Sequence, residues 1–505
     1  MALAILVVVI PIVNGPQGPA ASGISLALSG SPVGYAPRAT DFQQFPDTAG
    51  ASSKLMADPT PVMGWSSWSF LREGANASEI EGEAEALVTN GLASVGYRYV
   101  NIDDGWYQCP GPDGPNVDPY GRWVINATNY PEAGSANGVE AVAAFVHHLG
   151  LKFGIYETPG ISEQAVKENT PVLGTSYTAD EIATKVRENN YNCGGMVGLN
   201  YSSPGAQAYV DSTVDELASW GVDYIKLDGI TNGNVPDIRA WARAIADSGR
   251  SIVLDTTEGS FTLAIAPELE RYSNQWEFAP DIEIHGPDEG SGNGCGQPPY
   301  VGCRDVFPLT SYSHWRDRFE DVAVWQPYGG PGGFNDYDSI EVGDGPTASG
   351  MSYAAEESQL SLWALGSAPL ILGSDLTSNV SNAYGSRHAL DRTDLDLLTN
   401  REVIEVDQDA IDASRISVVG SAQVFSKLEP SGDGVVGLFD TSTHLTAANE
   451  TISTTTAAMG LPDDPDGYWV ENLWTGSTWW IPASGHIVAS VSPEGVALYR
   501  VTPVD

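Results

Sequence analysis

The pattern of apolar and polar positions divides this chain into two differently built parts. Between residue 61 and about residue 409, short apolar runs of strand length alternate with stretches whose apolar residues recur at helical i, i+3, i+4 spacing. Strands are predicted over residues 62–65, 99–103, 152–156, 224–228, 251–255, 272–278, 333–336 and 369–373. Eight strands that alternate with helices predict an α/β fold, the (β/α)8 or TIM barrel.

Helical spacing and capping signals mark the segments between these strands. Apolar residues at helical spacing predict helices over 139–149, 205–220, 237–248 and 356–365. Ser78, followed by Glu81, has the sequence of a capping box at the start of a further helix. A doubly wound parallel sheet is the alternative architecture, but the sequence has no glycine-rich dinucleotide or phosphate-binding motif that would favour it.

The pattern changes at about Ala413. Short alternating runs, separated by turn residues, occur at 423–427, 434–439, 468–470 and 495–501. This pattern is typical of an antiparallel β-sandwich domain. We therefore place the barrel at residues 60–410 and a C-terminal antiparallel β domain at residues 411–505.

The N-terminal segment differs from both parts. Residues 2–10 are all apolar, about the length of a signal-peptide core and too short to span a bilayer. Residues up to about 59 are rich in Gly, Pro, Ser and Ala. We predict a signal peptide over residues 1–22 and a linker over residues 23–59, and hence a secreted, extracellular protein.

The charge of the chain restricts its partners. The 505 residues include 23 Lys and Arg against 65 Asp and Glu, which gives a net charge of −42 at pH 7. Phosphate backbones and anionic lipid surfaces attract clustered cations, so nucleic acid and membranes are not expected partners. The sequence does not determine the oligomeric state.

The four cysteines and the glycosylation sequons also favour secretion. Cys295 and Cys303 bracket a compact loop that a disulfide would close, and Cys109 and Cys193 form the second candidate pair. No cysteine has the spacing of a zinc ligand. Asn-X-Ser/Thr sequons, which mark candidate glycosylation sites of a secreted protein, occur at Asn76, Asn126, Asn200, Asn379 and Asn449.

Lys226 and Asp228 are the most informative pair of residues in the chain. They lie two positions apart at the end of a predicted strand, so their side chains point to the same side. Charged groups facing the interior are costly, and active sites of barrels lie at the carboxyl ends of the strands. A structural ion pair is the alternative, but polar residues also follow other strands of the series.

The residues at the ends of the other strands indicate a sugar site. Carboxylates accept hydrogen bonds from vicinal hydroxyls, and aromatic side chains stack on the apolar faces of sugar rings. A carboxylate metal site is the rival interpretation; no histidine lies nearby, so we predict neither a metal nor another cofactor. Besides Lys226, the residues predicted to contact the substrate are Trp65, Asp103, Asp104, Tyr156, Trp276 and Asp338.

Two of the carboxylates suit the chemistry of a retaining glycosidase. In such enzymes one carboxylate attacks the anomeric carbon and a second, about 5–5.5 Å away, protonates the leaving oxygen. We predict that Asp228 is the nucleophile, with a pKa lowered by Lys226, and that Asp281 is the acid across the barrel mouth. Asp321 is a lesser candidate, since it reads as part of a helix.

Several motifs together resemble glycoside hydrolase family 27, the family of α-galactosidases and α-N-acetylgalactosaminidases. The most specific are MGWSSW at 63–68, NIDDGW at 101–106, YIKLDG at 224–229 and FNDYD at 334–338, and the resemblance extends over about residues 61–503. It implies that Asp228 is the nucleophile and Asp281 the acid/base. It also implies that Asp103 and Asp104 bind the O4 and O6 hydroxyls, and that Trp65, Tyr156, Lys226 and Asp338 make further contacts to the ring.

The chain departs from the family pattern at several positions, and the family's Asp-Pro-Asp-Met reads Asp336-Tyr337-Asp338-Ser339 here. Glu277 stands where the family has an arginine that contacts the O2 side of the sugar, and Gly105 and Ile230 replace two cysteines. The long connections 158–204 and 282–313 are expected to rise over the barrel mouth and to influence specificity. We therefore predict an α-galactosidase acting on an oligo- or polysaccharide, with three alternatives: a β-L-arabinopyranosidase, an isomaltose-releasing dextranase, or a non-catalytic sugar-binding barrel.

Overall fold

The computed structural model describes residues 59–257, 261–283, 309–377 and 390–504. Its main sheet has eight parallel strands, which follow their chain order from β1 to β10, and the last strand, β11, pairs with β1. Ile340, which follows the last strand but one, pairs in parallel with Leu372 of the last strand and links the two edges. The strands are β1 (Met63–Ser66), β2 (Tyr99–Ile102), β3 (Lys152–Glu157), β7 (Tyr224–Leu227), β8 (Val253–Thr257), β9 (Gln275–Glu277), β10 (Phe334–Asp336) and β11 (Leu370–Leu372).

Each of the eight predicted barrel strands is present, and the sixth is much shorter than predicted. The prediction over 272–278 reduces to the three residues of β9, because the preceding residues form helix α8 (Ala266–Tyr272). Pro267 lies in the first turn of α8, where its missing N–H is not needed. The barrel prediction is confirmed.

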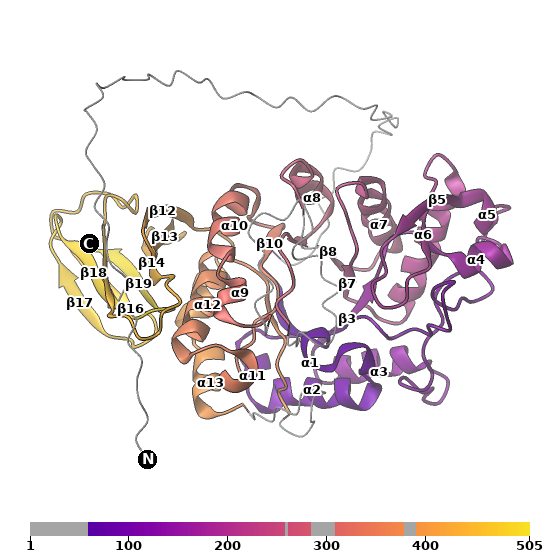
Figure 1. The fold of residues 1–505 in the computed structure, drawn as a ribbon, viewed down its shortest axis with the longest axis horizontal. Coiled ribbons are helices and arrows are strands. Elements are labelled where there is room, and N and C mark those ends of the chain that lie inside the picture. The colour runs from indigo at the N-terminus through magenta and orange to yellow at the C-terminus, as the bar shows by residue number, and fades with distance from the viewer. Residues whose placement is uncertain (1–58, 258–260, 284–308, 378–389, 505) are drawn as a thin grey trace, which may run out of the picture. The chain divides into compact units, whose positions relative to one another are not determined.

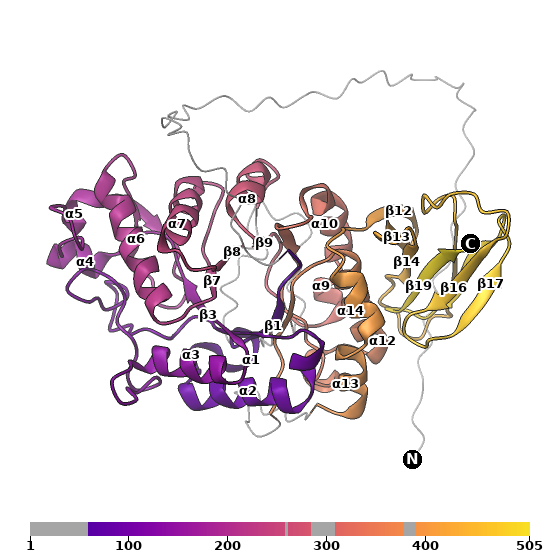
Figure 2. The same ribbon diagram turned by 180° about the vertical axis from the view of Figure 1, so that it is seen from behind.

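Helices lie outside the strands, as Figures 1 and 2 show. The predicted helices are confirmed to within a few residues, as α3, α6, α7 and α12. The remaining bounds are as follows: α1 (Trp68–Leu71), α2 (Ala77–Thr89), α3 (Gly138–His148), α6 (Pro204–Ser219), α7 (Val235–Ser248), α9 (Tyr312–Trp315), α10 (Arg318–Trp325), α11 (Pro346–Ser349), α12 (Tyr353–Leu365), α13 (Arg392–Leu398) and α14 (Arg401–Asp407).

Helix α2 begins earlier than the predicted capping box. Its N-cap is Asn76, whose side-chain oxygen accepts a hydrogen bond from the backbone N–H of Glu79. The Asn76 amide in turn donates to the Glu79 carboxylate at 2.5 Å. Asparagine is as good an N-cap as serine, and Glu79 stands three residues after Asn76. The helix therefore begins at this pair and not at Ser78 and Glu81.

The long connection after β3 is a folded unit of its own. We call this connection, residues 158–203, the β3–α6 insertion. It contains a small antiparallel sheet in the order β4-β6-β5. Cys193 in this insertion forms a disulfide with Cys109 of the connection after β2, which confirms one predicted pair. Its elements are β4 (Ile161–Ser162), α4 (Glu163–Glu168), α5 (Ala179–Ile182), β5 (Ala183–Glu188) and β6 (Met196–Leu199). The other predicted disulfide, Cys295 with Cys303, lies outside the described residues.

The C-terminal part is an antiparallel β domain, as predicted. A six-stranded sheet in the order β12-β13-β14-β19-β16-β17 accompanies the pair β15-β18. Lys427 on β13 is buried and donates to the carbonyls of Val406 and Ile411 and, at 2.8 Å, to Asp409, which fastens this sheet to the end of the barrel. The strands are β12 (Ser414–Val419), β13 (Ala422–Leu428), β14 (Gly434–Asp440), β15 (Glu450–Thr455), β16 (Tyr468–Asn472), β17 (Thr478–Ile481), β18 (His486–Val491) and β19 (Val496–Pro503).

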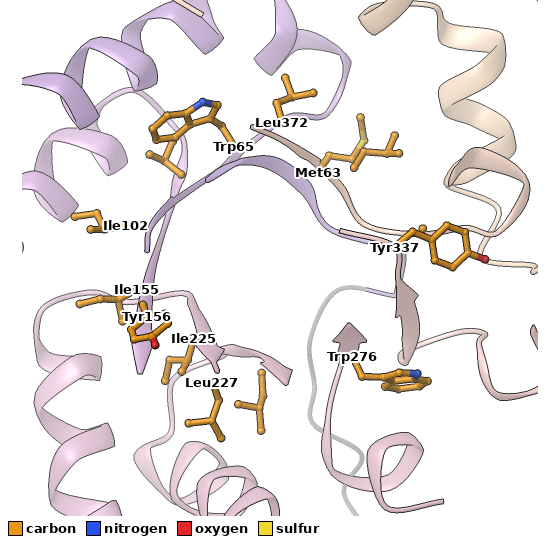
Figure 3. Packing of buried hydrophobic residues seen from close by; sticks show 14 of the residues in the cluster. Met63, Trp65, Ile102, Ile155, Tyr156, Ile225, Leu227, Trp276, Tyr337 and Leu372 are labelled. Atoms are coloured by element: carbon orange, nitrogen blue, oxygen red, sulfur yellow. The ribbon is translucent and has the colours of Figure 1, made fainter. Parts of the chain in front are cut away.

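The barrel strands separate apolar from polar side chains by alternation. Ile225 and Leu227 of β7 belong to the large apolar cluster, part of which Figure 3 shows. Tyr224 and Lys226 of the same strand instead line a pocket. Because β-strand side chains alternate between the two faces, every second residue of a barrel strand is available for chemistry. Among the described helices, none is long and apolar enough to cross a membrane.

Candidate active site

A pocket opens among residues at and beyond the carboxyl ends of the barrel strands. Its walls carry many carboxyl groups, and Lys226 is the only lysine or arginine among the described residues that line it. Such a concave site with convergent polar groups is the expected position of catalysis in this fold. The lining residues used below are Trp65, Trp68, Lys226, Asp255, Thr257, Glu277, Asp281, Asp336 and Asp338.

Lys226 is paired with Asp103 rather than with Asp228. Its ammonium lies 2.9 Å from the Asp103 carboxylate, which also accepts a hydrogen bond from the Ser66 hydroxyl at 3.2 Å. Burial by itself would lower the pKa of Lys226, but the charges of Asp103, Asp228 and nearby carboxylates raise this pKa well above its usual value. Lys226 is therefore a permanent cation in the pocket.

Asp228 follows β7 and is held by two neighbours. The Thr257 hydroxyl donates to its Oδ1 at 2.9 Å, and the Gly229 backbone N–H also bonds to the carboxylate. Burial raises the pKa of Asp228, and Lys226 offsets this only in part. The prediction of a lowered pKa is therefore wrong, because desolvation outweighs the attraction to a lysine that is already paired.

Asp281 lies in the connection after β9 and belongs to a cluster of acids. Carboxylate oxygens of Glu277, Asp281 and Asp338 lie within 4.8 Å of one another. Burial, followed by the charges of Glu283 and Asp338, raises the pKa of Asp281 well above its usual range. The charge of Asp228 contributes in the same direction, so the two predicted catalytic groups influence each other electrostatically. A proton held on Asp281 is what a general acid requires.

Asp338 is oriented by the backbone around it. Its own N–H donates to Asp336 at 2.7 Å, and its Oδ2 accepts a hydrogen bond from the backbone N–H of Ile282. Asp338 has a positive φ of 71°, a conformation that is uncommon outside glycine. The backbone therefore places this carboxylate directly against the residue that follows Asp281.

Asp104 is surrounded by donors from two parts of the chain. Its Oδ1 accepts hydrogen bonds from the Gly105 N–H at 2.7 Å and the Tyr107 hydroxyl at 2.6 Å. Its Oδ2 accepts one from the side chain of Asn192, in the β3–α6 insertion, at 2.6 Å. Cys193, the next residue, forms the disulfide with Cys109. The insertion, held by the disulfide, thus positions the Asn192 amide to donate to Asp104. The sequence analysis did not predict this contact.

We expect that the Asn192→Ala variant has a kcat/KM lowered about tenfold, chiefly through KM, because Asp104 loses one of its charge-assisted hydrogen bonds. Steady-state kinetics on the best substrate test this. Asn129→Ala is the control, since that amide donates at 3.2 Å to the Ala75 carbonyl, which does not line the pocket. Equal kinetics for the Asn192 variant and the wild type would contradict the positioning role.

The tryptophans lie differently from the prediction. Trp276 is 0% exposed, does not line the pocket and donates its indole N–H to Asn335 at 2.9 Å, so this geometry does not support its predicted contact with substrate (Figure 3). Strand alternation gives the pocket position to Glu277 instead. Trp65 reaches the wall but is fully buried, and its indole donates to the Ser374 carbonyl at 2.9 Å.

Trp68, at the end of the same motif as Trp65, was missed by the sequence analysis. It is partly exposed and lines the pocket, so it is better placed than Trp65 to stack on a sugar. The Arg72 guanidinium lies over its ring at 4.2 Å from the centroid, and Arg72 also pairs with Glu283. The sequence signal that could have identified Trp68 is its place as the second tryptophan of the MGWSSW motif.

Tyr156 is buried, and its hydroxyl has no hydrogen-bond partner in the described part of the chain. Burial, followed by the charges of Asp104 and Asp228, raises the pKa of Tyr156 well above its usual value. Its hydroxyl is therefore a stable neutral donor beside two of the predicted site carboxylates. Asp321 lies within α10, as expected, and does not line the pocket.

The buried carboxyl groups predict that the protein is most stable in mild acid. Burial raises the pKa of Asp104 and of Asp255 to about 6, and that of Glu283 to about 7. Between the unfolded values near 4 and these values, the folded state binds more protons, so its stability falls as the pH rises. We expect the free energy of unfolding to decrease by on the order of a few kcal/mol from pH 5 to pH 8.

Thermal unfolding at constant ionic strength measures this change. The Asp255→Asn variant should show a smaller difference in melting temperature between pH 5 and pH 8, because it lacks one titrating group of the barrel interior. A melting temperature that is higher at pH 8 than at pH 5 would contradict the sign.

The fold and this acidic pocket define a barrel enzyme of the glycoside hydrolase class, and comparison with known proteins names the family. Residues 60–170 and 309–409 match the profile described as alpha galactosidase A, and residues 419–501 match the alpha galactosidase C-terminal beta sandwich domain. A probable α-galactosidase of Dictyostelium discoideum is 30% identical over 396 residues, 76% of this chain and 78% of that protein. The chain belongs to glycoside hydrolase family 27, the α-galactosidase family.

Other similar proteins differ in the sugar named in their activity. The α-galactosidase of Oryza sativa subsp. japonica is 28% identical over 449 residues, 88% of this chain and 85% of that protein. The β-L-arabinopyranosidase of Geobacillus stearothermophilus, solved with arabinose, has a TM-score of 0.76 at 25% identity and covers 90% of this chain and 100% of that one. α-Galactosidase I of Mortierella vinacea shares the fold with a TM-score of 0.66 at 24% identity, over 90% of this chain and 100% of that one.

Proposed function

We propose that the protein is a secreted, retaining exo-glycosidase that releases terminal α-linked galactose from an oligo- or polysaccharide. Asp228 and Asp281 are its catalytic groups. The geometry that carries this proposal is an acidic pocket in which Asp281 lies close to Glu277 and Asp338. Lys226, the only cation among the described residues that line this pocket, stands on β7 two positions before Asp228. The leader sequence, the sequons and the Cys109–Cys193 disulfide support secretion.

The proposed reaction is a double displacement. Asp228 attacks the anomeric carbon while Asp281 gives its proton to the departing glycosidic oxygen, which leaves a covalent glycosyl-enzyme. Asp281, now a carboxylate, takes a proton from water, and the hydroxide oxygen displaces Asp228 from the anomeric carbon. The product keeps the configuration of the substrate.

The environments of the two carboxyls suit these roles. Gly229, Thr257 and Lys226 all stabilise the ionised form of Asp228, whereas Asp281 lies among other acids. Such opposite surroundings separate the pKa values of an acid and a nucleophile. Trp68 supplies an aromatic wall, and Asp103, Asp104, Tyr156 and Asp338 supply hydrogen-bonding groups for the ring.

Hydrolysis of a panel of 4-nitrophenyl glycosides tests the proposal. The α-galactoside should be the best substrate, with the β-galactoside and the glucosides turned over far more slowly, and nuclear magnetic resonance should show an α-configured first product. No release of nitrophenol from any glycoside would refute the enzymatic function, and a first product of β configuration would refute the retaining mechanism.

A β-L-arabinopyranosidase is the second candidate. Two solved structures of one such enzyme, from Geobacillus stearothermophilus, have TM-scores of 0.76 and 0.74, against 0.66 for the Mortierella α-galactosidase. Both oxygens of Asp104 are already occupied by protein donors, which favours a sugar that makes fewer contacts there. The 4-nitrophenyl β-L-arabinopyranoside in the same panel distinguishes the two sugars.

The pH profile should depend on Lys226. This cation lowers the pKa of both Asp228 and Asp281, so the Lys226→Met variant should have a kcat/KM profile whose two limbs move to higher pH. Lys167→Met is the control, because that ammonium pairs with Asp113 at 2.6 Å and neither residue lines the pocket. An unmoved profile for the Lys226 variant would show that this cation does not tune the catalytic pair.

A further inference from the structure

Two neighbouring tryptophans are exposed on the C-terminal β domain. Trp469 of β16 and Trp480 of β17 face each other across the antiparallel strand pair and are 51% and 49% exposed. Directly facing residues of such a pair have Cβ atoms about 4.5–5.5 Å apart, so the two indoles form one patch on one side of the sheet. A contiguous apolar patch, unlike a single exposed apolar residue, indicates an interaction site.

The patch lies on the side of the sheet that packs against the barrel. Trp469 pairs with Thr502 of β19, and Leu498, four residues earlier on β19, points to the same side. Leu498 is buried in the large apolar cluster of the barrel, where α12 contacts β19. The tryptophans stand toward β17, which is the free edge of the sheet (Figure 1). They are therefore on the part of this side that the barrel leaves uncovered.

Trp480 is held in one orientation although half of it is exposed. Its indole N–H donates to the backbone carbonyl of Asp466 at 3.0 Å. Its ring lies against Gly467, where an added Cβ atom would come within 2.7 Å of the indole nitrogen. A ring that is already fixed loses little conformational entropy when a ligand binds. The turn before β16 thus orients an aromatic face and leaves it accessible to a ligand.

The groups around the patch are mainly acceptors of hydrogen bonds. Asp463 and Asp466 in the turn before β16 are exposed, and Glu471 follows Trp469 on the same side of the strand. Arg500, on this side of β19, is already paired with two glutamates. Anionic chains are therefore repelled. A second copy of this protein is repelled as well, because it carries the same net charge of −42.

We propose that Trp469 and Trp480 bind a neutral polysaccharide chain. The apolar faces of sugar rings stack on indoles, and sugar hydroxyls donate hydrogen bonds to the carboxylates beside the patch. A neutral chain also meets no repulsion from the acidic surface. Neither tryptophan lines the catalytic pocket, so this surface is a second carbohydrate site. The inference rests on the proposed function only for the choice of a galactose-bearing polymer as the probe.

Native gel electrophoresis through galactomannan, a soluble neutral polymer with α-linked galactose, tests the proposal. The acidic protein migrates rapidly, and binding to the slow polymer retards it. Saturating free D-galactose, which fills the catalytic pocket, should leave most of the wild-type retardation in place. Trp469→Ala should weaken the binding about tenfold, because one stacking surface is lost, and the variant with both tryptophans changed to alanine should not be retarded.

Tyr353→Ala is the matched control, because Tyr353 on α12 is 47% exposed and lies outside the patch. It should be retarded like the wild type. Trp469→Phe keeps an aromatic face and should retain most of the binding, which separates stacking from a loss of folding. Should the double variant fail to fold, the two single Trp469 variants still decide the question.

Three results would overturn the proposal. The first is a wild-type protein that galactomannan does not retard, and the second is equal retardation of the wild type and the Trp469→Ala variant. The third is a wild-type dimer, seen by analytical ultracentrifugation, that this variant dissociates, because a second copy would then cover the patch.

The two proposals fail in different ways. Hydrolysis of nitrophenyl α-galactoside without retardation by galactomannan would overturn this inference and leave the proposed hydrolysis intact. Retardation that depends on Trp469, without hydrolysis of any glycoside, would support this inference and refute the proposed hydrolysis.

Discussion

The Asp228→Ala variant is expected to lose essentially all turnover. Removal of the attacking carboxylate eliminates the covalent intermediate, and losses of a catalytic nucleophile are on the order of 10⁴- to 10⁶-fold in kcat. Binding of substrate should change much less, because Asp103, Asp338 and Lys226 remain. The measurement is kcat and KM on the best nitrophenyl glycoside from the panel.

Azide makes this result specific for a nucleophile. The cavity left by the missing carboxylate admits a small anion, and Lys226 provides a positive charge beside it. Azide should therefore restore part of the turnover and yield a glycosyl azide of inverted configuration. Asp247→Ala is the control, because its carboxylate lies at the solvent-facing end of α7 and contacts only Arg243 at 3.4 Å among the described residues. Unchanged turnover in the Asp228 variant would exclude this residue as the nucleophile.

The Asp281→Ala variant should show an effect that depends on the leaving group. A general acid contributes about 10²- to 10⁴-fold when the departing oxygen needs a proton. A dinitrophenolate leaves without one, so its release should be nearly normal in the first step. Natural disaccharides should therefore lose activity by the full factor, and activated aryl glycosides by much less.

A series of aryl glycosides measures this dependence. In the variant, the logarithm of kcat/KM should fall steeply with the pKa of the leaving phenol, whereas the wild type should show a shallow slope. Asp321→Ala, which alters the lesser candidate on α10, should keep the wild-type slope. Equal losses for all substrates would place the general acid at another residue.

The two catalytic predictions were accessible from the sequence because they depend on local order. Lys226 and Asp228 stand two residues apart at the end of an apolar run, and strand alternation alone places them on one side. The order of eight strands and their helices likewise follows from periodicity. Asp281 was predicted from its place after the sixth strand, across the barrel mouth from Asp228, and the family resemblance implies the same role.

The differences between the predictions and the structure have a common physical origin. Trp276 and Glu277 are adjacent, and the sequence does not show which of the two faces inward until the register of β9 is known. The structure pairs Glu277 with Asp336 of β10 and directs Glu277 into the pocket. The pKa of Asp228 was misjudged for a similar reason, because burial depends on every segment packed around the site, whereas only the nearby lysine is visible in the chain.

The sequence by itself determined the barrel, the antiparallel C-terminal domain and the set of acids at the strand ends, because alternation and helical spacing are properties of neighbouring residues. Only the tertiary structure decided which of these acids meet, as Glu277, Asp281 and Asp338 do, and that Asn192 of the insertion reaches Asp104 across 88 residues of chain. Those contacts depend on how distant segments pack, and so do the desolvation and the repulsion that set the charge of the pocket.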